Sequence, residues 1–235
     1  MKADFTPVKH PQNHREVFFM KQFTPKNRRA LGILSAGLLA AFALWTALLT
    51  RVDVRTIGPN GSTVGMATLN AAFHRLTGVH MTLYTVTDWL GLVPVALCVG
   101  FGALGLVQWI RRRRLGRVDR SLLVLGCFYV AILGVYLLFE KLEVNYRPVL
   151  IDGRLEASYP SSTTLLTLCV MPAAATQLWG RIKRKALRCC VVCAILGFTL
   201  FMVVARLVSG VHWLTDILGG VLLSGGLVAG YEALR

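Results

Sequence analysis

Long stretches without a charged residue dominate this chain and decide what it can fold into. Four such stretches are about as long as a membrane span, and two shorter ones follow toward the C-terminus. A helix needs about 20 mostly apolar residues to cross the hydrocarbon core of a bilayer. The pattern therefore predicts an all-α polytopic membrane protein with six transmembrane helices, at 31–49, 89–110, 121–139, 157–180, 189–205 and 217–231, the last extended outward through 211–215.

The positive charge of the chain fits membrane topology better than a nucleic-acid partner. The chain has 26 Lys and Arg against 11 Asp and Glu, and its basic residues form runs between the apolar stretches. By the positive-inside rule, the basic segment 1–29 and the loops at 111–120 and 181–188 lie in the cytoplasm, and so do both termini. Segment 1–29 is too long and polar for a cleaved signal peptide. We expect a cytoplasmic basic segment at 1–29 and one six-helix membrane domain at 30–235.

A further short helix is expected outside the membrane spans. Met66, Leu69, Phe73 and Leu76 recur at helical spacing within 63–76, which predicts a helix lying along the interface. His74 lies in this segment and His80 follows it, but no further ligand-type residues stand at useful spacing. We therefore expect no metal site, and no cofactor.

Three cations lie in polar segments that this topology brings to the outer face. Lys141 and Arg147 belong to the segment KLEVNYRP after the third span, and Arg206 opens the segment RLVSGVHWLTD between the fifth and sixth. Two of the three are guanidinium groups, which can bind phosphate oxygens through two hydrogen bonds. These cations predict a site for a phosphoryl group.

The same face carries a helix start and a candidate nucleophile. In YPSSTT, Pro160 followed by Ser161 and Ser162 predicts a helix N-terminus, whose free N–H groups attract an anion. His212 and Asp216 are four residues apart, so Asp216 can accept from one imidazole nitrogen and leave the other as a nucleophile. Because cations and a helix N-terminus already balance the phosphoryl charge, the chemistry needs no metal.

These segments resemble the signature of the type 2 phosphatidic acid phosphatase (PAP2) superfamily of integral-membrane lipid phosphatases. That signature reads Lys-x6-Arg-Pro, then Pro-Ser-Gly-His, then Ser-Arg-x5-His-x3-Asp. The third motif matches from Arg206 to Asp216, with Ala205 in place of Ser. The resemblance implies a six-helix bundle in which His212 forms a phosphohistidine and Asp216 orients it. It also implies that phosphate is bound by Lys141, Arg147, Ser161, the Ser162 backbone N–H and Arg206.

The chain departs from the signature at two places. Five residues, not six, separate Lys141 from Arg147, and an extended connection with about 3.3 Å of reach per residue would absorb the difference. Thr163 stands where the family has a histidine that protonates the leaving oxygen and later activates water. Such acid–base help is worth about 10²–10⁴ in rate, and no other histidine lies between His80 and His212.

The missing histidine has two consequences for function. A phosphate leaving group needs less protonation than an alkoxide, so we expect a preference for isoprenyl diphosphate over a phosphate monoester. Alternatively, another group supplies the proton: Glu156 is the first candidate, beside Tyr159 and Thr163 itself, with Glu143 and Asp152 in the same loop.

The sequence thus predicts a lipid phosphatase of the bacterial inner membrane, acting on a phosphorylated lipid from the extracytoplasmic side. Two alternatives stay open. One is a catalytically degenerate protein that binds lipid phosphates, and the other is a lipid phosphotransferase that uses the same His212 intermediate and excludes water. The oligomeric state is not determined by the sequence. Gly210, Gly219 and Gly220 near the third motif, and Gly225 and Gly226 later in the chain, predict close helix packing around the site.

Overall fold

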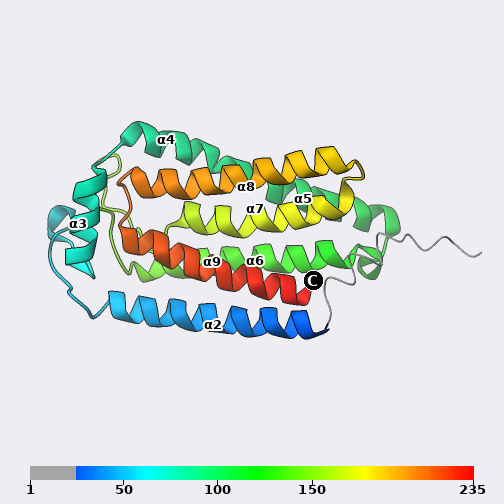
Figure 1. Ribbon diagram of the computed structural model, residues 1–235, viewed down its shortest axis with the longest axis horizontal. Coiled ribbons are helices and arrows are strands. Elements are labelled where there is room, and N and C mark those ends of the chain that lie inside the picture. Colours follow the sequence, from blue (N-terminus) through cyan, green and yellow to red (C-terminus); the bar gives the residue numbers. More distant parts are fainter. Residues whose placement is uncertain (1–24) are drawn as a thin grey trace, which may run out of the picture.

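The computed structural model describes residues 25–235, which form a bundle of long helices (Figure 1). An all-α fold is therefore confirmed for this part of the chain. Its helices are α2 (Pro25–Leu49), α3 (Ala67–Thr77), α4 (Met81–Leu90), α5 (Leu92–Arg112), α6 (Arg120–Leu142), α7 (Ser162–Arg181), α8 (Lys185–Val208) and α9 (Leu214–Leu234), with the short 3-10 helices η1 (Pro59–Gly61) and η2 (Leu115–Arg117) in the loops.

Within the described part of the chain, five helical stretches are long and apolar enough to cross a membrane. They are Lys26–Leu49, Met81–Arg112, Arg120–Leu142, Lys185–Val208 and Leu214–Leu234. These stretches coincide with five of the six predicted spans, and they mark the chain as an integral membrane protein.

The remaining predicted span, 157–180, corresponds to α7. The uncharged run placed its start too early, at 157, whereas the helix start predicted from Pro160, Ser161 and Ser162 is confirmed. Residues 157–161 belong to a loop, and the helix begins only at Ser162. Threonines and Gln177 make α7 more polar than the other long helices, but it lies inside the bundle, between α8 and α9 (Figure 1). Gln177 Nε2 donates to the Tyr231 hydroxyl at 2.8 Å and to the Ser121 carbonyl at 3.1 Å. A helix surrounded by protein can satisfy such groups, so it does not need a lipid-like surface.

The second predicted span, 89–110, starts earlier in the structure and has a break. Helix α4 begins at Met81, and α5 follows after an interruption at Gly91. Pro94 explains this break, because it has no N–H to donate to the Leu90 carbonyl one turn earlier. The extra turns of α4 carry Tyr84, Thr87 and Asp88 toward α8.

The short helix predicted within 63–76 is α3, and it lies across one end of the bundle (Figure 1). Its Asn70 is fully buried and contacts the start of α9. Asn70 Nδ2 donates to Thr215 Oγ1 at 2.9 Å, and Asn70 Oδ1 accepts from the Thr215 N–H at 3.2 Å. One free N–H of the first turn of α9 is thereby satisfied by another helix, and the start of α9 is held in place.

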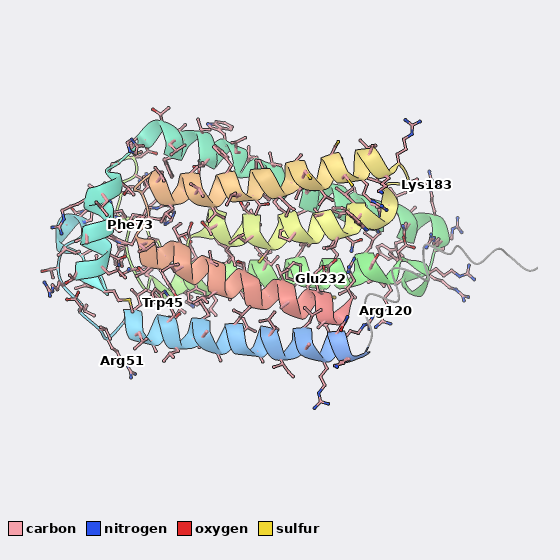
Figure 2. All side chains as sticks on the ribbon, viewed as in Figure 1. Trp45, Arg51, Phe73, Arg120, Lys183 and Glu232 are labelled. Atoms are coloured by element: carbon pink, nitrogen blue, oxygen red, sulfur yellow. The ribbon has the colours of Figure 1, made fainter. Side chains whose placement is uncertain are left out.

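The loops with the basic runs lie at one end of the bundle and the other loops lie at the opposite end, as the charge pattern predicts. Figure 2 shows Arg51 and Phe73 at one end, and Arg120 and Lys183 at the other. Helix α2 starts at the second end, where the C-terminus also lies (Figure 1). Most of the predicted basic segment 1–29 lies outside the described residues.

Two glycines of α9 confirm the predicted close packing. A Cβ at Gly226 would lie 2.8 Å from the Leu39 side chain of α2, and Ser35 Oγ donates to the Gly226 carbonyl at 2.8 Å. A Cβ at Gly219 would lie 2.5 Å from the Tyr159 ring. Larger residues would therefore push α2 and the 157–161 loop away from α9.

Candidate active site

The loop between α8 and α9 positions His212 at the end of the bundle that α3 covers. Gly210 in this loop has φ +68°, and a Cβ there would lie 1.8 Å from the Gly78 carbonyl. The Ser209 carbonyl accepts from the His80 N–H at 2.9 Å. The loop is thus fixed against residues 78–80, and only glycine has both the conformation and the space that position 210 requires.

His212 and Asp216 lie side by side in the protein interior, where they are 3% and 0% exposed. Asp216 Oδ2 accepts from the Trp213 N–H at 2.9 Å and lies 3.6 Å from His212 Nδ1. On the other side of the ring, His212 Nε2 lies 3.2 Å from Arg147 Nη1. A guanidinium can only donate, so Nε2 accepts and Nδ1 carries the ring proton on the side of Asp216.

The surroundings keep the His212 imidazole neutral. Burial lowers its pKa well below the ordinary value of 6.5, and the positive charges of Arg147 and Arg206 lower the pKa further. A neutral ring with its proton on Nδ1 has a free electron pair on Nε2. The arrangement is therefore that of a nitrogen nucleophile.

Arg147 connects His212 to the loop before α7. Its side chain is largely buried, and Nε lies 3.1 Å from Glu156 Oε2. Its N–H donates to the Glu156 carbonyl at 3.0 Å, and Trp213 Nε1 donates to the neighbouring Tyr146 carbonyl at 2.7 Å. These contacts fix the Arg147 guanidinium next to Nε2, where it can bind an oxygen of a phosphoryl group attacked there.

Arg206 is held by α4 and by the start of α7. Its Nη2 lies 3.0 Å from Asp88 Oδ1 and 2.5 Å from Thr163 Oγ1. The Tyr84 ring packs against the guanidinium, with 4.8 Å from Cζ to the ring centroid. The Thr163 hydroxyl, at the position of the family histidine, thus contacts Arg206.

A cavity of about 350 Å³ opens beside His212. Arg147, Glu156 and Ser162 contribute to its lining, together with Glu140 and Glu143 from the end of α6. A second, mostly apolar cavity of about 590 Å³ lies between α5, α6 and α7 and reaches Asp88 and Thr163. The two cavities share the lining residues Tyr136, Ser162 and Leu165, so a polar chamber adjoins an apolar one.

Of the five predicted phosphate-binding residues, Arg147 and Ser162 line the polar cavity, whereas Lys141, Ser161 and Arg206 are not among its lining residues. Ser162 lines the polar cavity, while Ser161 is the N-cap residue of α7, is fully buried and does not contribute to the lining. Lys141 is exposed and also stands outside the lining, whereas its neighbour Glu140 is part of it.

The reason lies in the length of α6. The connection from Lys141 was expected to be extended, but α6 continues to Leu142. Successive side chains of a helix point about 100° apart, so Glu140 and Lys141 face different surroundings. The six-residue spacing of the first motif, counted back from Arg147, falls on Glu140. An acid therefore occupies the place where that motif has its lysine.

The three candidate proton donors have different surroundings. Glu156 lines the cavity and is paired with Arg147, and Thr163 contacts Arg206. The Tyr159 hydroxyl lies 2.7 Å from Thr46 Oγ1. Burial raises the pKa of Tyr159 above its ordinary value, so this phenol keeps its proton more firmly than a free one.

Sequence reasoning missed Asp88, Tyr84 and Glu140. Asp88 did give a signal, because it is an ionisable residue directly before an uncharged stretch. Counting the motif spacing back from Arg147 leads to position 140, but it does not show that the Glu140 side chain lines the cavity. Tyr84 gave no signal in the sequence. Across residues 25–235, no group of three or more His, Cys, Asp or Glu is arranged to hold a metal ion.

Two comparisons with known proteins bear on the sequence and the fold of this chain. The sequence model of the PAP2 superfamily matches residues 138–231. The fold is similar to the crystal structure of a transmembrane PAP2-type phosphatidylglycerolphosphate phosphatase from Bacillus subtilis, with a TM-score of 0.55, 21% identity and coverage of 85% of this chain and 94% of that chain. No curated protein matches the chain. The region matched by the PAP2 model, residues 138–231, contains all three motifs.

Proposed function

We propose that this protein is a membrane lipid phosphatase in which His212 takes up the phosphoryl group. The observation that carries the proposal is the placement of His212: its Nε2 lies 3.2 Å from Arg147 Nη1 beside a polar cavity, and Asp216 lies behind Nδ1. The match of residues 138–231 to the PAP2 model supports the reaction class. The proposed site faces the extracytoplasmic side of a bacterial inner membrane, and the reaction uses no metal.

The residues divide the work in two steps. In the first, the Nε2 electron pair forms a bond to phosphorus while the bond to the leaving oxygen breaks. The ring then carries a positive charge, which the Asp216 carboxylate stabilises through Nδ1–H. Arg147 binds the phosphoryl oxygens from the cavity lining, and Arg206 adds its positive charge from outside that lining. In the second step, water attacks phosphorus, the P–N bond breaks, and phosphate and free His212 result.

A lipid substrate is supported by the adjoining apolar cavity. Leu92, Val95 and Leu133 line it and are also exposed on the outside of the helices, where a bilayer would cover them. A lipid chain in this cavity would place its head group next to Ser162 and the polar chamber. The phosphatidylglycerolphosphate phosphatase of similar fold acts, by its description, on such a lipid phosphate.

Within the lipid phosphates, we propose a preference for isoprenyl diphosphate. Thr163 cannot protonate a leaving alkoxide at neutral pH, and its hydroxyl contacts Arg206. A phosphate leaving group carries its negative charge without that help, so the diphosphate is the less affected substrate.

The test is phosphate release by the full chain in detergent with EDTA present, from isoprenyl diphosphate and from phosphatidic acid. We expect diphosphate turnover to exceed monoester turnover, to fall at least about a thousandfold in His212→Ala, and to persist in His80→Ala, a histidine outside the cavity lining. Equal turnover of both lipids would mean that another residue supplies the proton. No release with lipid binding retained would instead indicate the binding protein, and transfer to a lipid acceptor the phosphotransferase.

A further inference from the structure

One face of α4 contacts Arg206. Tyr84, Thr87 and Asp88 are three and four residues apart, so they lie along the same side of this helix. Arg206 Nη1 donates to the Tyr84 carbonyl at 3.5 Å and to Thr87 Oγ1 at 3.4 Å. Its Nη2 pairs with Asp88 Oδ1 at 3.0 Å. Helix α4 therefore holds the guanidinium group of a buried arginine that α8 supplies.

The Tyr84 ring lies against both arginines of the site. The Arg206 Cζ is 4.8 Å from the ring centroid, and the Arg147 Cζ is 5.8 Å from it. Both arginines are buried, because Arg206 is 2% and Arg147 8% exposed. Two positive charges gathered at one ring repel each other, and the repulsion is stronger inside a protein than in water. The electron-rich face of an aromatic ring attracts cations, so the ring offsets part of this repulsion.

The other charged partners of the two arginines are exposed. Glu156 pairs with Arg147 and is 41% exposed, and Asp88 pairs with Arg206 and is 59% exposed. Exposed carboxylates hold a cation weakly. These two acids also belong to different segments, so they draw the two guanidinium groups in different directions. The Tyr84 ring is the aromatic partner that both guanidinium groups share.

Packing alone does not explain an aromatic ring at this position. Tyr84 is half-buried on α4, at the edge of the bundle (Figure 1). Its hydroxyl forms no hydrogen bond with another residue among 25–235. A leucine would fill much of the same space, but it has no electron-rich face for two cations. The contacts with the arginines are therefore the feature that sets the ring apart.

We propose that Tyr84 is a positioning residue, whose ring keeps Arg147 and Arg206 together so that both charges act on one phosphoryl group. This inference rests on the proposed function, which places that group at His212, 3.2 Å from Arg147 Nη1. Without the ring, repulsion would separate the two guanidinium groups, and each would follow its own exposed carboxylate. The protein would then bind a phosphoryl anion less tightly.

The test measures the affinity of the full chain in detergent for dodecylphosphonate, a lipid-like anion that cannot be hydrolysed. Tyr84→Leu removes the ring and should raise Kd about five- to tenfold, which is comparable to the contribution of a buried cation–π contact. Tyr84→Phe keeps the ring and should stay within about twofold of the unaltered protein. Trp89→Leu is the matched control, because it removes an exposed aromatic residue from the same helix. It should leave Kd unchanged.

Progressively fluorinated phenylalanines at position 84 separate electrostatics from packing. Fluorine withdraws electrons from the ring face with little change in size, so Kd should rise stepwise along the series. A flat series would overturn the inference, and so would equal affinity of Tyr84→Leu and Tyr84→Phe or no binding by the unaltered protein. Release of phosphate from isoprenyl diphosphate without a fluorine effect would refute the inference alone. A stepwise rise in Kd without any phosphate release would refute the phosphatase alone.

Discussion

The inner wall and the mouth of the polar cavity differ in how deeply their side chains are buried and in how firmly contacts hold them. At the inner wall, His212 and Asp216 are buried, and contacts with Trp213 and Arg147 fix them. At the mouth, Glu140 and Glu143 are exposed at the end of a helix. A change at the wall disturbs packing and backbone hydrogen bonds, while a change at the mouth leaves the fold intact.

The family pattern is kept or lost along the same division. The third motif is preserved from Arg206 to Asp216, and only the serine before Arg206 is replaced, by Ala205. Glu140 is exposed at the end of α6, and Thr163, in the first turn of α7, lines the adjoining apolar cavity. Under the proposed function, the group that attacks phosphorus is fixed by the packing of the interior, while the residues that depart from the family pattern lie outside that buried set.

The largest effect is expected at the inner wall. Asp216→Asn keeps an oxygen for the Trp213 N–H but removes the charge that stabilises the His212 ring during attack. We expect kcat to fall at least about a hundredfold, with little change in melting temperature. Asp119→Asn, at the other end of the bundle, serves as the control for both measurements. A loss in Asp216→Asn below about threefold would contradict the assigned role.

At the start of α7, Thr163→His restores the residue of the family pattern. If the missing acid limits monoester hydrolysis, the rate with phosphatidic acid should rise about tenfold relative to the rate with diphosphate, which is less than acid catalysis yields at its best. Thr163→Val also removes the hydroxyl contact with Arg206 but adds no acid, so it should not raise this ratio. An unchanged ratio in Thr163→His would show that another group already protonates the leaving oxygen.

The pH dependence of activity tests the surroundings of His212. Attack requires the neutral ring, and burial with Arg147 and Arg206 lowers the pKa of His212 below 6.5. The ring therefore stays neutral at pH 6.5, and kcat/KM should decline only below that pH. The titration of the substrate, measured separately, is subtracted from the profile. A decline that begins above pH 6.5 and is due to the enzyme would be evidence against the neutral ring.

The smallest effect is expected at Asp88. Its side chain is 59% exposed and pairs with Arg206 at 3.0 Å, and exposed pairs contribute about 0.2–1 kcal/mol. Asp88→Asn should accordingly reduce kcat/KM two- to fivefold, at about that free energy, because Arg206 keeps its contacts with Thr163 and Tyr84. Asp53→Asn, which breaks the exposed pair with Arg55, should leave kcat/KM unchanged. A loss of more than tenfold would give Asp88 a direct part in the reaction.

Several parts of the fold could be predicted because they depend on local sequence. Spans such as 121–139 follow from the need for apolar residues in a bilayer, and α3 followed from the spacing of Met66 to Leu76. The start of α7 could not be placed at Ser162 by hydropathy, because the uncharged residues 157–161 form a loop. Its polar side chains also find partners inside the bundle, such as Tyr231 for Gln177.

The sequence by itself determined that the chain is an all-helical membrane protein with His212, Asp216, Arg147 and Arg206 in a family pattern. Those conclusions rest on apolar run length and on residue spacing, both of which are local. Only the tertiary structure decided that Glu140 rather than Lys141 lines the cavity, and that Asp88 from a distant helix pairs with Arg206. The direction of a side chain depends on where its helix ends and on what packs against it, and neither can be read from spacing alone.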